Sequence, residues 1–412
     1  MTSVCLYFKV HQPYRLKRRE ESSKDQRYAY EDYEADEQSI NYLADHCYLP
    51  ANALISELIT QHPGRFGVSF SISGTITGLL QKYRPDVITS FQQLVDTGSV
   101  ELLGETYYHS LSFLHSKKEF HRQITKHSEL IRNVFGVRPQ VFRNTELLHN
   151  NQLAVDITNL GFNGILCEGQ QRILKGRSAN RVYQSPSPGK TRLLLRNAAL
   201  SDDIAFRFDD VNWDRYPLTA GKFAEWLHAH PAEDNVINLM LDYETFGIHK
   251  KPDSGIFGFL KALPEAVLAN QHFIFSTPSN VLKSSDGGEV YDVPAIISWE
   301  EEAHAHGAWF EMLHQNNTLK KIYSLEKMVL QTGNPEIIDT WGQLQAAEYF
   351  YYMADQSIKA AAYKYHNPFT GAAEAFHSYC KIVADFEIAL IEKAIAGRKR
   401  NFSRASFINS FL

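Results

Sequence analysis

The chain has 412 residues, 44% of them hydrophobic, so it can bury a sizeable core in one large domain or in a barrel with a second domain. Its formal net charge of −5 argues against the basic face that nucleic-acid binding needs. The four cysteines are scattered, as expected for free thiols in a reducing compartment. We find no signal-peptide pattern and no apolar stretch of membrane-spanning length, so we expect a soluble cytoplasmic protein with no membrane partner. The oligomeric state is not predicted.

Short apolar runs alternate with amphipathic stretches over the first two-thirds of the chain. The runs predict seven buried strands, at Val4–Val10, Phe66–Ile72, Val100–Leu103, Gln140–Asn144, Gly164–Cys167, Asn235–Leu241 and His272–Phe275. The stretches between them predict helices, at Pro50–Gln61, Pro85–Asp96, Ser116–Phe135, Gln152–Leu160, Ala220–Ala229 and Gly255–Ala269. This alternation predicts an α/β barrel or a doubly wound parallel sheet.

Two regions depart from the alternation. Residues 168–210 contain a Ser- and Pro-rich segment and short apolar runs at Leu193–Leu195 and Ile204–Phe208, and we interpret them as a loop-rich insertion with short strands of its own. Beyond Trp299 the pattern is helical, at Glu302–Leu330, Glu336–Gln356 and Ala372–Ala396. We therefore expect a barrel over residues 1–298 and a C-terminal helical domain over residues 299–412.

Polar and ionisable residues cluster directly after the predicted strands. In parallel α/β folds the carboxyl ends of the strands form the edge at which active sites lie, so these residues are candidates for one common site. The candidates are His11 and Gln12 after the first strand, Glu105 and His109 after the third, Glu146 after the fourth, and Asp242 and Glu244 after the sixth.

The carboxylates among them suggest a chemistry. Asp242 and Glu244 are two residues apart and point to one face if the segment is extended. If Glu146 shares their cleft, repulsion between like charges raises the pKa of one carboxyl group, which can then act as an acid near neutral pH. Paired carboxylates on different strands suit the cleavage of a glycosidic bond. On pattern alone two alternatives stay open, namely that Glu146 caps a helix and that Asp242 anchors a turn.

Four short motifs follow one another in an order that resembles glycoside hydrolase family 57. They are Val10–Pro13, Gly104–Leu111, Phe142–Leu147 and Leu241–Gly247. The α-amylase-type branch of the family is the most similar, through Leu195–Asn197 with Ser201–Phe208, and through Phe350–Met353 followed by Asn367–Phe369. The resemblance extends over almost the whole chain, and each motif is weak on its own.

The resemblance implies an incomplete seven-stranded (β/α) barrel followed by a helical domain that helps to close the active site. It implies a retaining hydrolase of α-1,4-glucan oligosaccharides or polysaccharides, with Glu146 as nucleophile and Asp242 as general acid and base. No cofactor and no metal are expected. Substrate contacts are implied for His11, Gln12, Glu105, His109 and Glu244, and in the helical region for Trp309, Gln315 and Glu348.

Two departures from the branch affect the substrate sites. The segment Ala308–Gln315 lacks the usual Gly-Asn step and has Phe310 and Glu311 after its tryptophan, and Glu348–Tyr349 stands where an Asp-His pair is usual. Three alternative functions therefore stay open. They are a 4-α-glucanotransferase that uses the same carboxylates, a metal-dependent polysaccharide deacetylase on a similar barrel, and a non-catalytic glucan-binding relative.

Other side chains have two interpretations each. Trp299, Trp309 and Trp341 are candidates for stacking on glucose rings, and packing between the domains is an equally good interpretation. Arg143 is near Glu146 in sequence and fits a structural ion pair as well as a catalytic contact. The histidine pairs, such as His304 and His306, lack the spacing that places two metal ligands and a general base on one helix.

Overall fold

The computed structural model describes residues 1–17, 30–186, 189–285, 287–299, 317–353 and 367–409, with the backbone alone over 396–409. The chain divides into two compact units. The first comprises Met1–Gln12, Glu34–His109 and Lys118–Gly307, and the second comprises Pro13–Tyr33, Ser110–Lys117 and Ala308–Leu412. The domain boundary expected at residue 299 adjoins residues 300–316, which lie outside the described residues.

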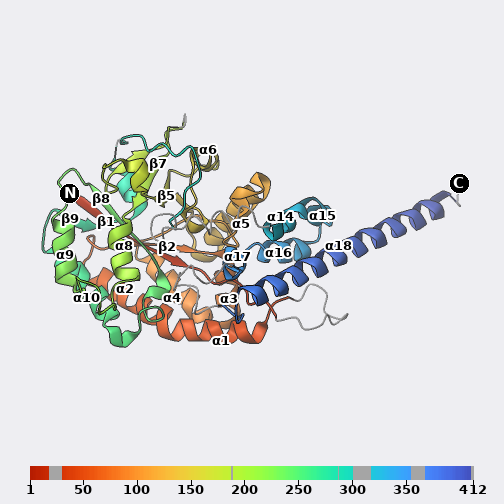
Figure 1. Ribbon diagram of the computed structural model, residues 1–412, viewed down its shortest axis with the longest axis horizontal. Coiled ribbons are helices and arrows are strands. Elements are labelled where there is room, and N and C mark those ends of the chain that lie inside the picture. Colours follow the sequence, from red (N-terminus) through yellow and green to blue (C-terminus); the bar gives the residue numbers. More distant parts are fainter. Residues whose placement is uncertain (18–29, 187–188, 286, 300–316, 354–366, 410–412) are drawn as a thin grey trace. The chain divides into compact units, whose positions relative to one another are not determined.

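The first unit is built on one sheet (Figure 1). Seven parallel strands follow one another in the order β3-β2-β1-β8-β7-β5-β4, while β6 pairs antiparallel with β7 and β9 pairs parallel with β1. The strands are β1 Thr2–Val10, β2 Val68–Ile72, β3 Val100–Leu102, β4 Val141–Arg143, β5 Gly164–Glu168, β6 Val182–Gln184, β7 Arg192–Arg196, β8 Val236–Asp242 and β9 Phe273–Phe275.

The two ends of this order, β3 and β4, meet through a parallel bridge between Gly104 and Phe142. The amide of Gly104 donates to Val141 O, and the amide of Arg143 donates to Gly104 O, both at 2.8 Å. Only glycine fits at this approach, because a Cβ on Gly104 would lie 2.4 Å from the ring of Phe162. The curved sheet is thus joined at the carboxyl ends of β3 and β4 by a bridge outside the strand ladders, and the predicted incomplete seven-stranded parallel barrel is confirmed.

Two strands differ from the prediction. The run Leu193–Leu195, which we expected inside an insertion, belongs to β7 and lies in the barrel between β5 and β8. Conversely β9, expected as a barrel strand, lies outside the main strand order and pairs with the amino half of β1. The position of β7 could not be predicted, because its pairing with β5 joins segments that the apolar pattern does not relate.

Eleven helices of the first unit are described. Their apolar positions recur at helical spacing, as in α5, where Phe120, Ile124, Ile131 and Phe135 are buried. A π-helical turn, Ala44–Tyr48, joins α1 to α2 without a break. The helices are α1 Tyr33–Leu43, α2 Leu49–Gln61, α3 Gly74–Tyr83, α4 Pro85–Asp96, α5 Lys117–Phe135, α6 Asn151–Asn159, α7 Gln171–Leu174, α8 Ala198–Ala205, α9 Ala220–His228, α10 Ile256–Leu268 and α11 Pro278–Lys283.

Side chains of the strands pack into an apolar cluster inside the barrel. Because side chains alternate between the two faces of a strand, one residue in two points inward. The inward members of this cluster are Cys5 and Tyr7 of β1, Leu103 directly after β3, Val141 of β4, Leu166 of β5, Leu194 of β7, and Val236 and Met240 of β8. The same alternation determines which residues come next at the carboxyl ends of these strands.

The described part of the second unit is helical, as predicted. Its helices are α14 Asn317–Ser324, α15 Glu326–Gln331, α16 Pro335–Gln343, α17 Ala347–Tyr352 and α18 Ala372–Asn409. Trp341 is fully buried, and its indole N–H donates to Ile322 O at 2.8 Å, so this tryptophan is a core residue of the unit. The predicted helices Glu302–Leu330 and Glu336–Gln356 fall partly outside the described residues.

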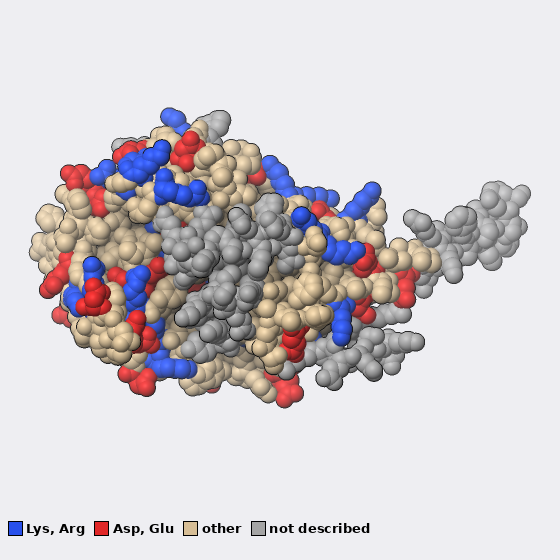
Figure 2. Space-filling model, viewed as in Figure 1, with Lys and Arg blue, Asp and Glu red and all other residues tan. Residues whose placement is uncertain are grey.

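On the face seen in Figure 2, basic and acidic side chains of the described residues are interspersed. Within the described part of the chain, no helix has the length and apolar character that crossing a membrane requires.

Candidate active site

On six strands, the next inward-pointing residue after the apolar cluster, two positions further along the chain, is charged. We call these residues the charge ring: Lys9 (β1), Glu105 (after β3), Arg143 (β4), Glu168 (β5), Arg196 (β7) and Asp242 (β8). Following the strand order from β3 through β4, β5, β7 and β8 to β1, the sign alternates at every step. The remaining strand, β2, contributes Ser71, whose hydroxyl lies 2.6 Å from that of Tyr7.

The charge ring is buried and paired. Lys9 Nζ lies 2.9 Å from Asp242 Oδ1, and Arg196 Nη1 lies 3.4 Å from Glu168 Oε2. Five of the six residues are at most 6% exposed, whereas the Asp242 side chain is 28% exposed. Replacing buried ion pairs by apolar side chains is often neutral or stabilising, so stability alone does not account for this ring. Such a concentration of ionisable groups at the carboxyl ends of parallel strands indicates a functional site.

Glu146 follows β4 in a short 3₁₀ turn, Thr145–Leu147. Both Glu146 (φ 52°) and Leu147 (φ 51°) adopt left-handed backbone conformations, which cost about 1–3 kcal/mol each for residues other than glycine. The turn is held by Asn144, whose side chain donates to Leu148 O at 3.0 Å and accepts from the amide of Thr145 at 3.0 Å. A strained backbone at a buried carboxylate is typical of a functional residue, because such strain persists mainly where it orients a functional side chain.

Both carboxylate oxygens of Glu146 are hydrogen-bonded. His109 Nε2 donates to Oε1 at 3.0 Å, and the indole N–H of Trp299 donates to Oε2 at 2.6 Å. Burial by itself raises the pKa of Glu146, but Lys9, His109 and Arg143 together hold it well below its ordinary value of 4.5. Glu146 is therefore an ionised, oriented carboxylate at neutral pH.

His109 lies at the centre of a buried polar cluster and also has a positive φ of 52°. Its second ring nitrogen, Nδ1, lies 3.3 Å from Glu105 Oε2 and 3.4 Å from Arg143 Nη1. Burial alone raises the pKa of Glu105, but His109, His127 and Arg143 lower it below its ordinary value. Because an ionised carboxylate can only accept, the contact with Glu146 requires a hydrogen on Nε2, while Nδ1 lies between the carboxylate of Glu105 and the guanidinium group of Arg143.

His11 and Gln12 follow β1 and extend the site on two sides. The ring of His11 stacks on that of His109, with centroids 4.3 Å apart, and its Nδ1 lies 2.6 Å from Ser73 Oγ. Gln12 Nε2 donates to Glu244 Oε1 at 3.3 Å. His11 thus contacts His109, which holds Glu146, and Gln12 contacts Glu244.

Glu244 differs in charge state from Glu146. Burial and then the charge of Asp242 raise its pKa from 4.5 to about 7, so it retains a proton over part of the neutral range. The hydroxyl of Tyr48, at the end of the π-helical turn, donates to its Oε1 at 2.6 Å. Nearby, burial lowers the pKa of His249 to about 4, which leaves that imidazole neutral.

The structure brings seven of the predicted site residues into one region of the first unit: His11, Gln12, Glu105, His109, Glu146, Asp242 and Glu244. Glu348 is buried in α17 of the second unit. Trp309, Phe310, Glu311 and Gln315 lie outside the described residues.

Three residues were missed or assigned differently. Lys9 was not singled out, although a lysine inside the otherwise apolar run Val4–Val10 is the available signal for a buried charge. Trp299 was a candidate for sugar stacking, and its indole N–H instead holds Glu146. Tyr48 lies in a helical stretch with no motif, so its contact with Glu244 could not be read from sequence.

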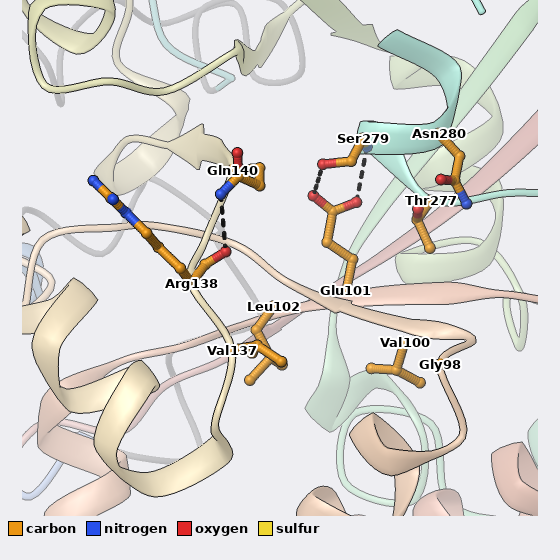
Figure 3. A pocket seen from close by; sticks show the side chains of 10 residues that line it. All are labelled: Gly98, Val100, Glu101, Leu102, Val137, Arg138, Gln140, Thr277, Ser279 and Asn280. Carbon is orange, nitrogen blue, oxygen red and sulfur yellow. Dashed lines mark hydrogen bonds between the residues drawn. The ribbon is translucent and has the colours of Figure 1, made fainter. Parts of the chain in front are cut away.

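A separate cavity of about 230 Å³ lies at the other end of the strands, next to the beginning of β3 and the segment that leads into β4 (Figure 3). There Glu101 accepts hydrogen bonds from the amide and the hydroxyl of Ser279, at the first turn of α11. Burial raises the pKa of Glu101. The lining residues come from β3 and the turn before it, from the segment before β4 and from the start of α11, and none of them belongs to the charge ring. No group of three or more His, Cys, Asp or Glu residues in the described ranges is arranged to hold a metal ion.

The chain is similar to known proteins in sequence and in fold. The chain is 38% identical over 405 residues to a protein of Methanocaldococcus jannaschii named "Putative alpha-amylase", covering 94% of this chain and 85% of that protein. Among solved structures, a 4-alpha-glucanotransferase from Thermococcus litoralis matches with a TM-score of 0.67 and 14% identity over 94% of this chain, which spans 59% of that enzyme's length. An alpha-amylase from Thermotoga maritima matches with a TM-score of 0.62 and 12% identity over 96% of this chain and 94% of its own.

The two solved structures, at such low identity, are evidence for the fold alone. The family is established by sequence, because residues 5–294 match one family model. The matched residues include the charge ring and Glu146. The chain therefore belongs to glycosyl hydrolase family 57.

Proposed function

We propose that this chain is a retaining, α-amylase-like hydrolase of α-1,4-glucans, with Glu146 as nucleophile and Asp242 as general acid and base. The observation that carries the proposal is the state of Glu146. It is buried, ionised, held through both oxygens and presented by a strained backbone. A nucleophilic carboxylate has to be charged and aimed before the sugar arrives.

Asp242 has the properties required of a partner that exchanges protons. It ends β8 on the inner face, and its side chain is the most exposed in the charge ring, at 28%. An acid and base must reach both the leaving oxygen and the incoming water. Glu146 and Asp242 are also linked through Lys9, which pairs with Asp242 and whose charge is among those that lower the pKa of Glu146.

The proposed reaction runs in two steps. Protonated Asp242 donates to the glycosidic oxygen while Glu146 attacks the anomeric carbon from the opposite face, which breaks the C–O bond and forms a glycosyl ester. Water then attacks the same carbon, Asp242 takes a proton from it, and Glu146 leaves as a carboxylate. The sugar is released with the α configuration it had in the chain.

The roles of the other predicted residues follow from their positions. His109 and Trp299 hold the two oxygens of Glu146, and Glu105 and Arg143 hold His109. His11, Gln12 and Glu244 provide polar groups for hydroxyls of the sugar. Trp309, Gln315 and Glu348 are proposed as substrate contacts from the helical domain.

The test is Glu146→Gln, assayed with maltoheptaose beside the wild type. A catalytic carboxylate predicts a loss of roughly 10³-fold or more in kcat with the fold intact. Glu101→Gln is the matched control, because it replaces a half-buried carboxylate at the opposite end of the strands and should leave kcat unchanged.

Product analysis separates the neighbouring functions. Early ¹H NMR spectra of the wild-type reaction should contain the α-anomer first, and a β-anomer would contradict retention. Chains longer than maltoheptaose without new reducing ends would identify a glucanotransferase instead. Unchanged turnover by Glu146→Gln would remove Glu146 from the mechanism.

A further inference from the structure

Lys9 is a lysine within a buried strand. It is 6% exposed and lies on the inner face of β1 above Cys5 and Tyr7, which belong to the apolar cluster. The register of the β1–β8 pair places Lys9 directly opposite Asp242, and their charged groups lie 2.9 Å apart. The backbone pairing therefore fixes which carboxylate this lysine meets.

The same ammonium group acts on Glu146. Burial raises the pKa of Glu146, and the charge of Lys9 is among the effects that lower it, together with His109 and Arg143. One buried cation thus pairs with Asp242 and also favours the ionised form of Glu146. Replacing a whole buried ion pair by apolar side chains is often neutral or stabilising, so stability alone does not account for a lysine at this position.

We propose that Lys9 is a positioning residue, which holds Asp242 in place through the ion pair that the β1–β8 register sets up and places one buried cation at the proposed site. The inference rests on the proposed roles of Glu146 and Asp242 and names a cation that acts on both acids. Lys9 makes no bond to the substrate in this scheme and acts through the two acids.

The surroundings make the effect of removing Lys9 partial rather than complete. His109 and Arg143 also act on Glu146 and stay in place, and both of them act on Glu105. On the other side Asp242 is faced by Glu244 and by neutral His249. Without Lys9, Glu146 keeps two stabilising neighbours, so its pKa rises but a variant should retain measurable activity.

The experiment compares Lys9→Met with Lys9→Arg in the full-length enzyme. The pH dependence of kcat/KM is measured with maltoheptaose and with α-maltosyl fluoride, whose leaving group needs no proton. Loss of an opposite charge at close range raises a carboxyl pKa by about 1–3 units, so the acidic limb of Lys9→Met should move to higher pH by about one unit or more with both substrates. Lys9→Arg keeps the cation and should keep the limb in place.

The second readout concerns Asp242. If the ion pair aims this acid, Lys9→Met should lose more activity on maltoheptaose than on the fluoride, because only maltoheptaose needs a protonated leaving group. Lys250→Met is the matched control. Lys250 is a similarly buried lysine that pairs with Asp209 outside the charge ring, and its replacement should move neither the limb nor the ratio of the two substrates.

The outcomes separate this inference from the proposed function. The inference would be overturned if the acidic limb of Lys9→Met stayed in place and kcat/KM fell by the same factor for both substrates. The proposed function would stand in that case, provided that Glu146→Gln is inactive. Should Lys9→Met fail to fold, Lys9→Gln keeps a polar side chain and is subject to the same two criteria. Full activity of Glu146→Gln would instead overturn the proposed function, whatever Lys9 does.

Discussion

Replacing Trp299 by phenylalanine removes the hydrogen-bond donor to Oε2 of Glu146, which lies 2.6 Å from the indole nitrogen. An aromatic ring stays in place beside Phe206, whose ring is nearly parallel to that of Trp299 with centroids 6.4 Å apart. The change therefore tests the hydrogen bond rather than the packing. The hydrogen bond from His109 to Oε1 of Glu146 stays in place.

A hydrogen bond to a charged group contributes about 1.5–3 kcal/mol. The negative charge of Glu146 decreases as the carboxylate attacks, so part of this energy is already lost in the transition state of the wild type. The variant therefore loses mainly the fixed orientation of the Glu146 carboxylate. We therefore expect kcat/KM to fall nearer the lower limit, about tenfold, which corresponds to about 1.4 kcal/mol.

The assay is kcat/KM for maltoheptaose, with the melting temperature as a measure of folding. Trp213→Phe is the matched control, because Trp213 is also half-buried and packs edge-on against Trp226, far along the chain from the charge ring. An unchanged kcat/KM in Trp299→Phe, or an equal loss in Trp213→Phe, would refute the reasoning that Trp299 positions Glu146.

Two predictions concern stability. Because burial and Asp242 raise the pKa of Glu244 from 4.5 to about 7, the folded protein retains a proton that the unfolded chain releases, and this stabilising contribution is lost as pH rises between those values. The melting temperature of Glu244→Gln relative to wild type should therefore increase from pH 4.5 to about 7 and then level off, and a constant difference would contradict the assignment. Gly104→Ala should lower the free energy of unfolding by about 1–3 kcal/mol, since the added Cβ meets Phe162 at 2.4 Å. Gly221→Ala in α9 is its control in the same denaturation assay, because a Cβ there meets nothing within 4 Å, and a Gly104→Ala variant as stable as that control would be evidence against a tight barrel closure.

The sequence located the acidic candidates because strand ends are visible in it. A buried parallel strand is a continuous apolar run, and the first polar residue after it marks the carboxyl edge of the sheet. That reasoning placed Glu146, Asp242 and their neighbours correctly at one edge without any knowledge of strand order. Motif order then named the family, which the sequence comparison confirms.

The pairing of charges could not be predicted in the same way. Lys9 and Asp242 are far apart in the chain, and only the β1–β8 register makes them partners. Arg196 belongs to β7, which we expected inside a loop-rich insertion, so its place in the charge ring could not be predicted. Trp299 reaches Glu146 because Ile297, two residues before it, forms a bridge with His149. The apolar periodicity of the sequence gives no sign of this bridge.

The charge ring also bears on which acid exchanges the proton. On the β1–β8 side, Lys9 faces the three carboxyl groups of Glu146, Asp242 and Glu244. Glu146 and Glu244 are equally buried, at 3% exposed, but Lys9, His109 and Arg143 together lower the pKa of Glu146. Burial and the charge of Asp242 raise the pKa of Glu244 to about 7, so Glu244 keeps a proton over part of the neutral range. Tyr48 and Gln12 both donate to its Oε1, so the proton belongs on Oε2 of a side chain held from two directions. Asp242 has the most exposed side chain of the charge ring, at 28%, and pairs with Lys9. A proton kept on Glu244 removes one negative charge beside Asp242, the carboxyl group to which the proposed mechanism assigns the proton transfer.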